Sequence, residues 1–141
     1  MNDSVENLSL IKDIMTSPVI SVTLNQTVKH VLLLSKKKNV TGFPVVDTEQ
    51  KVIGVVSTLD LLTEMAIGKS HLKLGELPLI IKVEKDVIQL KPDTPIKLAL
   101  MQLIKNRVGR IIITDDEDIL CGIVSRKDLL NYFIEINNLE P

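Results

Sequence analysis

The chain has 141 residues, a net charge of −1 and one cysteine, and 45% of its residues are hydrophobic although only 2% are aromatic. The lack of a basic excess argues against duplex nucleic acid, where neutralised phosphates supply most of the affinity, and a single cysteine excludes a disulfide framework. No apolar run approaches the roughly 20 residues of a membrane helix, and the N-terminus lacks the pattern of a signal peptide. We therefore expect a reduced, cytoplasmic protein with no membrane partner.

The first half of the chain predicts the order β-α-β-β-α. A polar turn from Asp47 to Gln50 separates two apolar strands, which predicts an antiparallel hairpin. Asn25 is expected to cap the first helix, while Ser57 and Gly68 mark the start and the end of the second. The predicted strands are residues 19–22, 41–46 and 51–56, and the predicted helices are residues 26–38 and 57–67.

The second half repeats the first. Residues 54–62 (Gly-Val-Val-Ser-Thr-Leu-Asp-Leu-Leu) reappear 68 positions later as residues 122–130 (Gly-Ile-Val-Ser-Arg-Lys-Asp-Leu-Leu), and the alignment continues back to residue 19 without a gap. The chain is therefore a tandem duplication. The second set of strands is predicted at residues 87–90, 110–114 and 119–124, with one helix after Asp93 and another from Ser125 to Ile136.

The duplication predicts how the chain is divided. We expect units at residues 11–67 and 79–137, joined by a linker at residues 68–78. Residues 73–78 resemble residues 11–15, but the offset between them is shorter than 68 positions. The second half therefore carries an extra segment at residues 79–85. Because a half of about 60 residues has a marginal core of its own, the halves are expected to bury an apolar face against each other.

The repeated Ser-x-x-Asp pattern is the strongest candidate for chemistry. Ser57 with Asp60, and Ser125 with Asp128, each fit a capping box, in which two side chains satisfy free N–H groups at a helix start. The same geometry suits a ligand, since a helix N-terminus attracts phosphate and an aspartate accepts hydrogen bonds from the cis-diol of a ribose. The residues alone leave both interpretations open.

The whole pattern resembles a tandem pair of CBS (cystathionine-β-synthase-type) domains, known as a Bateman module. The resemblance extends from about Ile11 to Tyr132. It rests on the duplicated β-α-β-β-α order, on residues 42–47 (Gly-Phe-Pro-Val-Val-Asp) and on the two Gly-h-h-Ser-x-x-Asp motifs, where h is apolar. It implies a mixed fold, α+β or α/β, of two β-α-β-β-α CBS units packed sheet to sheet with pseudo-two-fold symmetry.

The resemblance also implies a class of ligand. Pairs of this kind enclose two clefts for adenosine derivatives: AMP, ADP, ATP, S-adenosylmethionine and in some cases NAD. It implies that Asp60 and Asp128 hold ribose hydroxyls, with Ser57 and Ser125 near phosphate or ribose. Adenine would contact backbone and apolar side chains at the first strand of a unit and at the first strand of its hairpin, where the candidates are Gly42, Phe43, Pro44 and Ile111.

The second motif is accompanied by three cations. Arg110 precedes the strand that begins at Ile111, and Arg126 and Lys127 follow Ser125. The gamma subunits of AMP-activated protein kinase look similar, with an arginine before this strand that contacts phosphate. We interpret the three cations as a phosphate cradle; the alternative for Arg126 and Lys127 is ordinary surface charge. Ile112 departs from the proline that is usual in the family.

The first motif has no such cations. Gly42, Thr58 and Leu59 occupy the positions that match the three cations of the second unit. We therefore expect a charged nucleotide, namely AMP, ADP or ATP, mainly in the cleft marked by Asp128. The cleft marked by Asp60 is expected to be empty or to hold a neutral adenosine moiety.

No pattern in the sequence indicates catalysis. We find no nucleophile–base pair, no metal-ligand cluster and no Gly-x-x-x-x-Gly-Lys loop, so we expect no enzyme activity, no required cofactor and no metal site. His30 and His71 are expected at the surface and Cys121 in the core. The acidic run from Asp115 to Asp118 is expected to be an ordinary hairpin turn.

Two functions compete. The first is a stand-alone regulatory protein that binds an adenine nucleotide and signals to a protein partner through a conformational or oligomeric change. The second is a ligand-free structural adaptor or dimerisation module that docks on an enzyme or transporter. A single-stranded nucleic-acid binder has little support, because the chain has few aromatics for stacking and no evident basic groove.

A homodimer is expected to form through the helices that follow the two motifs. The same apolar side chains could instead belong to the intramolecular core. They are Leu61, Leu62, Leu129, Leu130, Tyr132 and Phe133.

Overall fold

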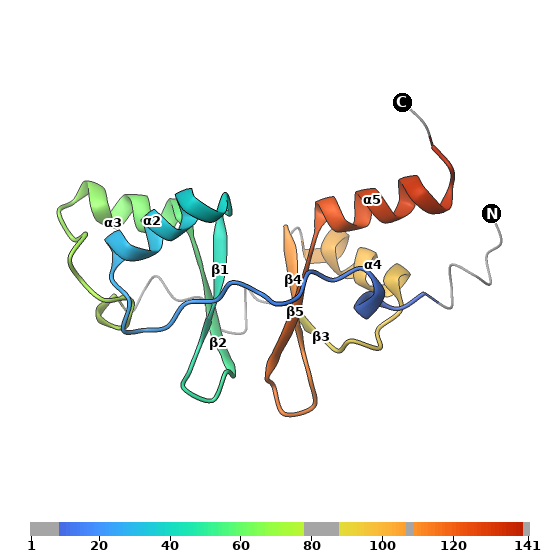
Figure 1. Ribbon diagram of the computed structural model, residues 1–141, viewed down its shortest axis with the longest axis horizontal. Coiled ribbons are helices and arrows are strands. Elements are labelled where there is room, and N and C mark those ends of the chain that lie inside the picture. Colours follow the sequence, from blue (N-terminus) through green and yellow to red (C-terminus); the bar gives the residue numbers. More distant parts are fainter. Residues whose placement is uncertain (1–8, 78–87, 107–108, 140–141) are drawn as a thin grey trace. The chain divides into compact units, whose positions relative to one another are not determined.

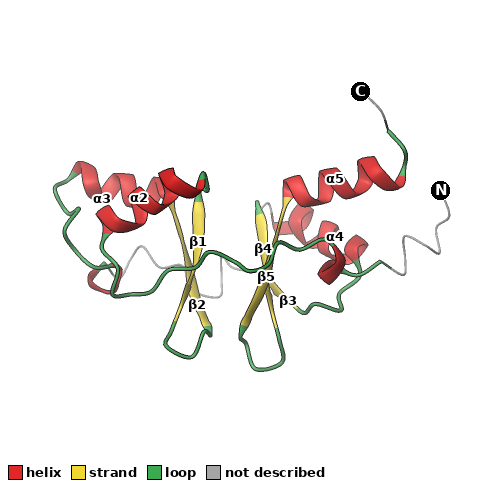
Figure 2. Ribbon diagram, in the orientation of Figure 1, coloured by secondary structure: helices red, strands yellow, loops and turns green. Residues whose placement is uncertain are grey.

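The computed structural model describes residues 9–77, 88–106 and 109–139. The chain divides into two compact units, drawn in Figure 1. The first unit comprises residues 20–87, and the second unit combines residues 1–19 with residues 88–141. Each unit joins helices to a small sheet (Figure 2), which confirms the predicted mixed fold.

The first unit pairs two helices with an antiparallel hairpin, as the sequence predicts. Its elements are α2 (Val28–Lys38), β1 (Gly42–Val46), β2 (Val52–Ser57), α3 (Thr58–Ala66) and the short 3-10 helix η2 (Leu74–Glu76). Helix α2 begins later than expected. Its N-cap is Thr27 rather than Asn25, because the Thr27 hydroxyl accepts a hydrogen bond from the N–H of His30 at 3.1 Å.

The second unit repeats this arrangement and adds a parallel strand. Its elements are η1 (Ile11–Asp13), β3 (Gln89–Leu90), α4 (Ile96–Asn106), β4 (Arg110–Thr114), β5 (Leu120–Ser125) and α5 (Arg126–Ile136). The sheet order is β3-β4-β5, with β3 parallel and β5 antiparallel to β4. Among the described residues of both units, no helix is long and apolar enough to cross a membrane.

A proline explains why the first unit lacks the strand predicted at residues 19–22. In the second unit the N–H of Ile112 donates to the carbonyl of Ile88 at 2.9 Å. The equivalent residue in the first unit is Pro44, which has no N–H to donate. Pairing there is reduced to a single bridge between Val22 and Val45. The predicted four-residue strand is therefore too long. In the second unit, Ile112 stands where the family usually has proline, and its N–H allows β3 to join the sheet.

The two short 3-10 helices complete the cores of the units. Ile11, in η1, is fully buried among Ile96, Ala99 and their neighbours in the second unit, and its N–H donates to the carbonyl of Thr94 at 2.8 Å. Leu74, in η2, is fully buried in the core of the first unit. The segment that precedes the first repeat in sequence therefore packs into the second unit, and the segment that follows the first repeat packs into the first.

Candidate functional site

The Ser125–Asp128 motif lies where β5 meets α5. Ser125 is both the last residue of the strand and the N-cap of the helix. Oδ2 of Asp128 accepts from the N–H of Ser125 at 2.8 Å and from its hydroxyl at 3.1 Å, while Ser125 Oγ accepts from the N–H of Asp128 at 3.3 Å. The capping box is therefore confirmed.

The capping hydrogen bonds use one of the two carboxylate oxygens of Asp128. Among the residues that the structure describes, the hydrogen bonds of the Asp128 side chain all use Oδ2, and none reaches Oδ1. Asp128 is only partly buried, so Oδ1 can accept a hydrogen bond from outside the protein. The structural and the ligand-binding interpretations of this motif are compatible.

The first unit contains the same capping box, but a different residue follows its serine. Oδ2 of Asp60 accepts from the N–H of Ser57 at 3.3 Å, and Ser57 Oγ accepts from the N–H of Asp60 at 3.1 Å. The hydroxyl of Thr58 lies 3.0 Å from the hydroxyl of Ser35, a buried residue of α2. Thr58 therefore ties α3 to α2, at the position where the second unit has Arg126.

Arg110 lies beside the second motif. The antiparallel register of β4 and β5 pairs Arg110 with Ser125, and the register of β1 and β2 pairs Gly42 with Ser57. Burial lowers the pKa of the partly buried Arg110 guanidinium, which nevertheless keeps its charge at neutral pH because arginine titrates far above it. The second motif thus has an arginine across from the helix start, and the first has a glycine.

The other two predicted cations are exposed. Arg126 and Lys127 are the first two residues of α5. The side chain of Arg126 lines a groove between α4 and α5. The N–H of Arg126 donates to the carbonyl of Gly109 at 3.3 Å, and the N–H of Asp128 is held by Ser125. Two of the first three N–H groups of the helix are therefore engaged, so an anion here would depend chiefly on side-chain cations.

The predicted adenine contacts are mostly core residues. Phe43 and Pro44 are buried in β1 and Ile111 is buried in β4, while Gly42 is partly exposed at the strand end. Phe43 belongs to the core of the first unit and Ile111 to the core of the second. A ligand at these strands would therefore meet backbone more readily than these side chains.

Sequence reasoning missed the segment that lies along β5. Thr16 and Ile123 exchange two backbone hydrogen bonds, of 2.9 and 3.1 Å, two residues before Ser125. The approach is close: a Cβ on Gly122 would lie 2.5 Å from Sδ of Met15. The glycine that both motifs share could have indicated this contact, because glycine within a strand often marks the close approach of another backbone segment.

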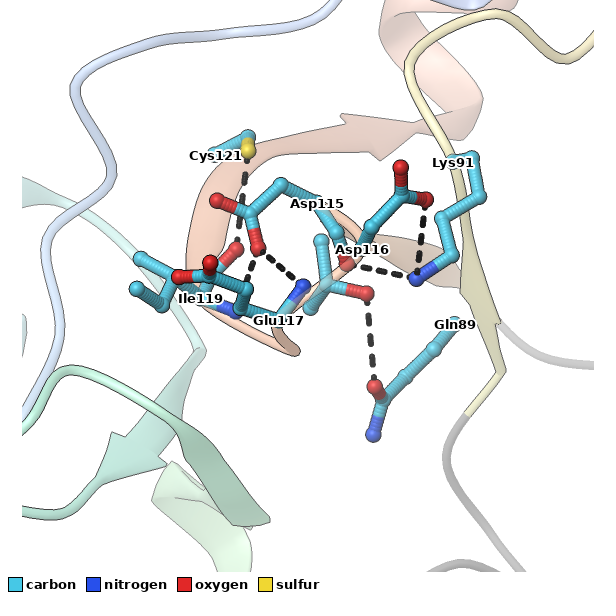
Figure 3. A network of polar contacts seen from close by, with 8 residues as sticks. Gln89, Lys91, Asp115, Asp116, Glu117, Ile119 and Cys121 are labelled. Carbon is cyan, nitrogen blue, oxygen red and sulfur yellow. Dashed lines mark hydrogen bonds and ion pairs between the residues drawn. The ribbon is translucent and has the colours of Figure 1, made fainter.

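The acidic run of the second hairpin is a turn, as predicted. Oδ1 of Asp115 accepts from the N–H groups of Glu117 and Ile119 at 2.8 and 3.0 Å (Figure 3). Lys91 contacts the carbonyl of Asp115 from the end of β3. Cys121 packs against the core of the second unit, and burial together with the Asp115 carboxylate raises the pKa of its thiol.

Comparison with known proteins identifies the family. The model of the CBS domain matches residues 11–67 and again residues 79–135, which together are most of the chain. The chain belongs to the CBS domain family. The two matches confirm that it is a CBS pair.

Relatives of this CBS pair include proteins of similar and of greater length. It is 31% identical over 156 residues to an uncharacterized protein of Methanocaldococcus jannaschii, a match that covers 90% of this chain and 92% of the relative. It is also 31% identical over 118 residues to the inosine-5'-monophosphate dehydrogenase of the same organism, covering 84% of this chain but only 22% of that protein.

Two similar solved structures contain adenosine derivatives. One is CBSX2 of Arabidopsis thaliana in complex with AMP, with 26% identity, coverage of 91% of this chain and 98% of that chain, and a TM-score of 0.77. The other is the CBS domain pair of protein MJ0100 in complex with 5-methylthioadenosine and S-adenosyl-L-methionine, with 25% identity, coverage of 89% and 99%, and a TM-score of 0.75.

Proposed function

We propose that this CBS pair is a regulatory protein that binds an adenosine derivative at the site marked by Asp128 and transmits the bound state to a partner protein. One observation carries the proposal: the β4–β5 register sets Arg110 across from Ser125, while the hydrogen bonds to the Asp128 side chain within the described residues leave Oδ1 unused. A carboxylate acceptor on the helix whose N-cap pairs with an arginine fits a ribose that carries a phosphate.

The chemistry of the site favours AMP, ADP or ATP over adenosine derivatives that lack a phosphate. The planar pair of donors on an arginine such as Arg110 suits phosphate oxygens, and Lys127 adds an exposed charge at the helix start. The AMP complex of CBSX2 supports this class of ligand. S-adenosylmethionine and NAD also contain the ribose that Asp128 would bind, and the complex of the MJ0100 pair supports the former.

The site marked by Asp60 is proposed to be empty or to bind a neutral adenosine moiety. Gly42 replaces the arginine, and the Thr58 hydroxyl is engaged with Ser35. Neither residue offers a charge to a phosphate, so a nucleotide would lose the electrostatic part of its affinity there.

A thermal-shift screen tests the proposal. Wild type and Asp128→Ala are melted with AMP, ADP, ATP, S-adenosylmethionine or NAD, and each variant is compared with its own ligand-free melt, because the substitution also weakens the helix cap. A ligand at 100 times its Kd stabilises the native state by about 2.7 kcal/mol, which raises the midpoint by roughly 5–15 °C. A rise lost in Asp128→Ala supports the nucleotide site. No rise with any ligand contradicts it and favours the adaptor.

We further propose that the chain forms a homodimer through the groove between α4 and α5. The residues predicted for self-association separate into two groups: Leu61 and Leu129 are buried in the cores of their units, whereas Leu130 is 59% exposed. Leu130, Ile104 and Phe133 line an apolar groove of about 630 Å³. An exposed apolar patch of this kind is typical of an interface.

A further inference from the structure

The turns of the two hairpins have the same internal geometry. In the first unit, Oδ1 of Asp47 accepts from the N–H groups of Glu49 and Lys51 at 2.8 and 3.0 Å. The carbonyl of Asp47 accepts from the N–H of Gln50 at 3.1 Å. In the second unit, Asp115 makes the equivalent three hydrogen bonds, at 2.8, 3.0 and 3.1 Å. A group that contacts one turn therefore has a matching place at the other.

In the second unit a lysine of the same chain contacts the turn. Lys91 directly follows β3, and its ammonium group donates to the carbonyl of Asp115 and lies 4.0 Å from Oδ1 of Asp116 (Figure 3). A carbonyl oxygen has two lone pairs, and Asp115 uses them for the turn and for Lys91. At the offset of 68 positions the equivalent of Lys91 is Thr23, whose short side chain carries no ammonium group.

The first unit has a pocket at the place that matches Lys91. Its volume is about 320 Å³. Thr23 lines it from the segment before α2, and Asp47 and Thr48 line it from the turn. Leu24 and Ile53 contribute apolar walls. Among the described residues that line this pocket, Asp47 is the only charged one, so the pocket favours a cation over an anion.

The pocket offers the contacts that Lys91 makes in the second unit. The counterparts of Asp47 and Thr48 are the two acidic residues that Lys91 contacts. The carbonyl of Asp47 accepts one hydrogen bond from the described residues, and Oδ2 of its carboxylate accepts none from them. Both oxygens can therefore accept from a ligand. Leu24 and Ile53 can cover an aliphatic stem, as apolar surface does for the methylenes of long cationic side chains.

We propose that this pocket binds a primary ammonium group on an aliphatic stem of about the length of a lysine side chain, with the ammonium group at the carbonyl and the carboxylate of Asp47. A small free amine and a lysine of a partner protein both present this chemistry. The pocket lies at the turn, which is the end of the β1–β2 hairpin opposite Ser57. The proposal is therefore independent of nucleotide binding at the Ser57–Asp60 motif and of the function proposed above.

An NMR titration that resolves the backbone amides tests the proposal. n-Butylammonium is added to the isotope-labelled full chain at neutral pH, up to about 50 mM, because so small a probe is expected to bind in the millimolar range. 1-Butanol has the stem without the charge, and butyltrimethylammonium has the charge without N–H donors. Nα-acetyl-lysine methylamide presents the same ammonium group as a residue of a peptide chain.

Two variants exchange the lysine between the units. Thr23→Lys gives the first unit a lysine where the second unit has Lys91, and this side chain should occupy the pocket. Lys91→Ala removes the ammonium group from the second turn. Gln50→Lys is the matched control, because it adds the same charge to the first turn with a side chain outside the pocket. Circular dichroism verifies that every variant is folded.

We expect n-butylammonium to cause saturable shifts at the first turn, residues 48–51, in wild type. Thr23→Lys should weaken this binding by about tenfold or more, because it removes a hydrogen-bonded charged ligand. Gln50→Lys should keep it within about threefold of wild type, since an exposed charge has a small effect. In Lys91→Ala, new shifts should appear at the second turn, residues 116–119, because the free ammonium group replaces the missing one.

The proposal is overturned if n-butylammonium causes no saturable shift at the first turn, or if 1-butanol or butyltrimethylammonium binds equally well. It is also overturned if Thr23→Lys leaves the binding unchanged. Should Thr23→Lys fail to fold, Lys91→Ala decides: the absence of new binding at the second turn contradicts the proposal. Binding of the blocked lysine as well as the free amine would assign the pocket to a lysine of a partner protein, and binding of the free amine alone to a small molecule.

Discussion

Arg110 and Ser125 are paired directly across the β4–β5 hairpin, and Ser125 is the N-cap of α5. The pairing places an arginine across from the start of the helix whose third residue is Asp128. In the first unit the same register pairs Gly42 with Ser57. The two motifs are nearly identical in sequence, and the residue across the hairpin distinguishes them.

Arg110→Gln should weaken AMP binding by about 10- to 100-fold, because a hydrogen bond to a charged group contributes about 1.5–3 kcal/mol. Adenosine has no phosphate, so its affinity should not change. Isothermal titration calorimetry of both ligands checks this. An equal loss for AMP and adenosine would mean that Arg110 shapes the site without contacting the phosphate.

Gly122→Ala should destabilise the second unit by about 1–3 kcal/mol, because the new Cβ would overlap Met15 and approach the carbonyl of Thr16 to 3.2 Å. Gly109→Ala is the matched control, since a Cβ there meets no atom within 4 Å. Urea unfolding measures both. The double variant Met15→Ala with Gly122→Ala should recover part of the loss; additive effects would show that the two residues do not conflict.

Ile11→Ala should cost about 2–5 kcal/mol, as expected for a fully buried aliphatic side chain. Although Ile11 precedes the first repeat, the loss of hydrogen-exchange protection should appear in α4 rather than in α2, because its side chain lies in the core of the second unit. Leu74→Ala should show the opposite pattern. Loss of protection in α2 after Ile11→Ala would contradict the observed packing.

Leu130→Asp should convert a homodimer to a monomer in analytical ultracentrifugation at micromolar concentration, because a carboxylate buried in a largely apolar interface loses its hydration. Leu130 is exposed in its own unit, so the melting temperature of the monomeric unit should change little. Wild type that sediments as a monomer, or a Leu130→Asp variant that remains a dimer, would exclude this interface.

Local patterns in the sequence predicted the secondary structure well. The hairpins and the helices that follow Ser57 and Ser125 are confirmed, because polar turns and capping residues act over a few positions. The strand at residues 19–22 was overestimated. Its extent depends on an N–H supplied by a distant residue, and Pro44 has none.

The parts that sequence reasoning missed depend on tertiary contacts. The packing of Ile11 into the second unit, and the pairing of Thr16 with Ile123, join segments more than 80 residues apart. No local periodicity encodes such contacts. The contact between the hydroxyls of Thr58 and Ser35 likewise became visible only when α2 and α3 were seen together.

The most direct test of the account is a calorimetric titration of AMP into wild type, Asp128→Ala and Asp60→Ala. We predict one principal site per chain, which is lost in Asp128→Ala and retained in Asp60→Ala. Two equal sites, or a site that disappears with Asp60 and survives without Asp128, would contradict it.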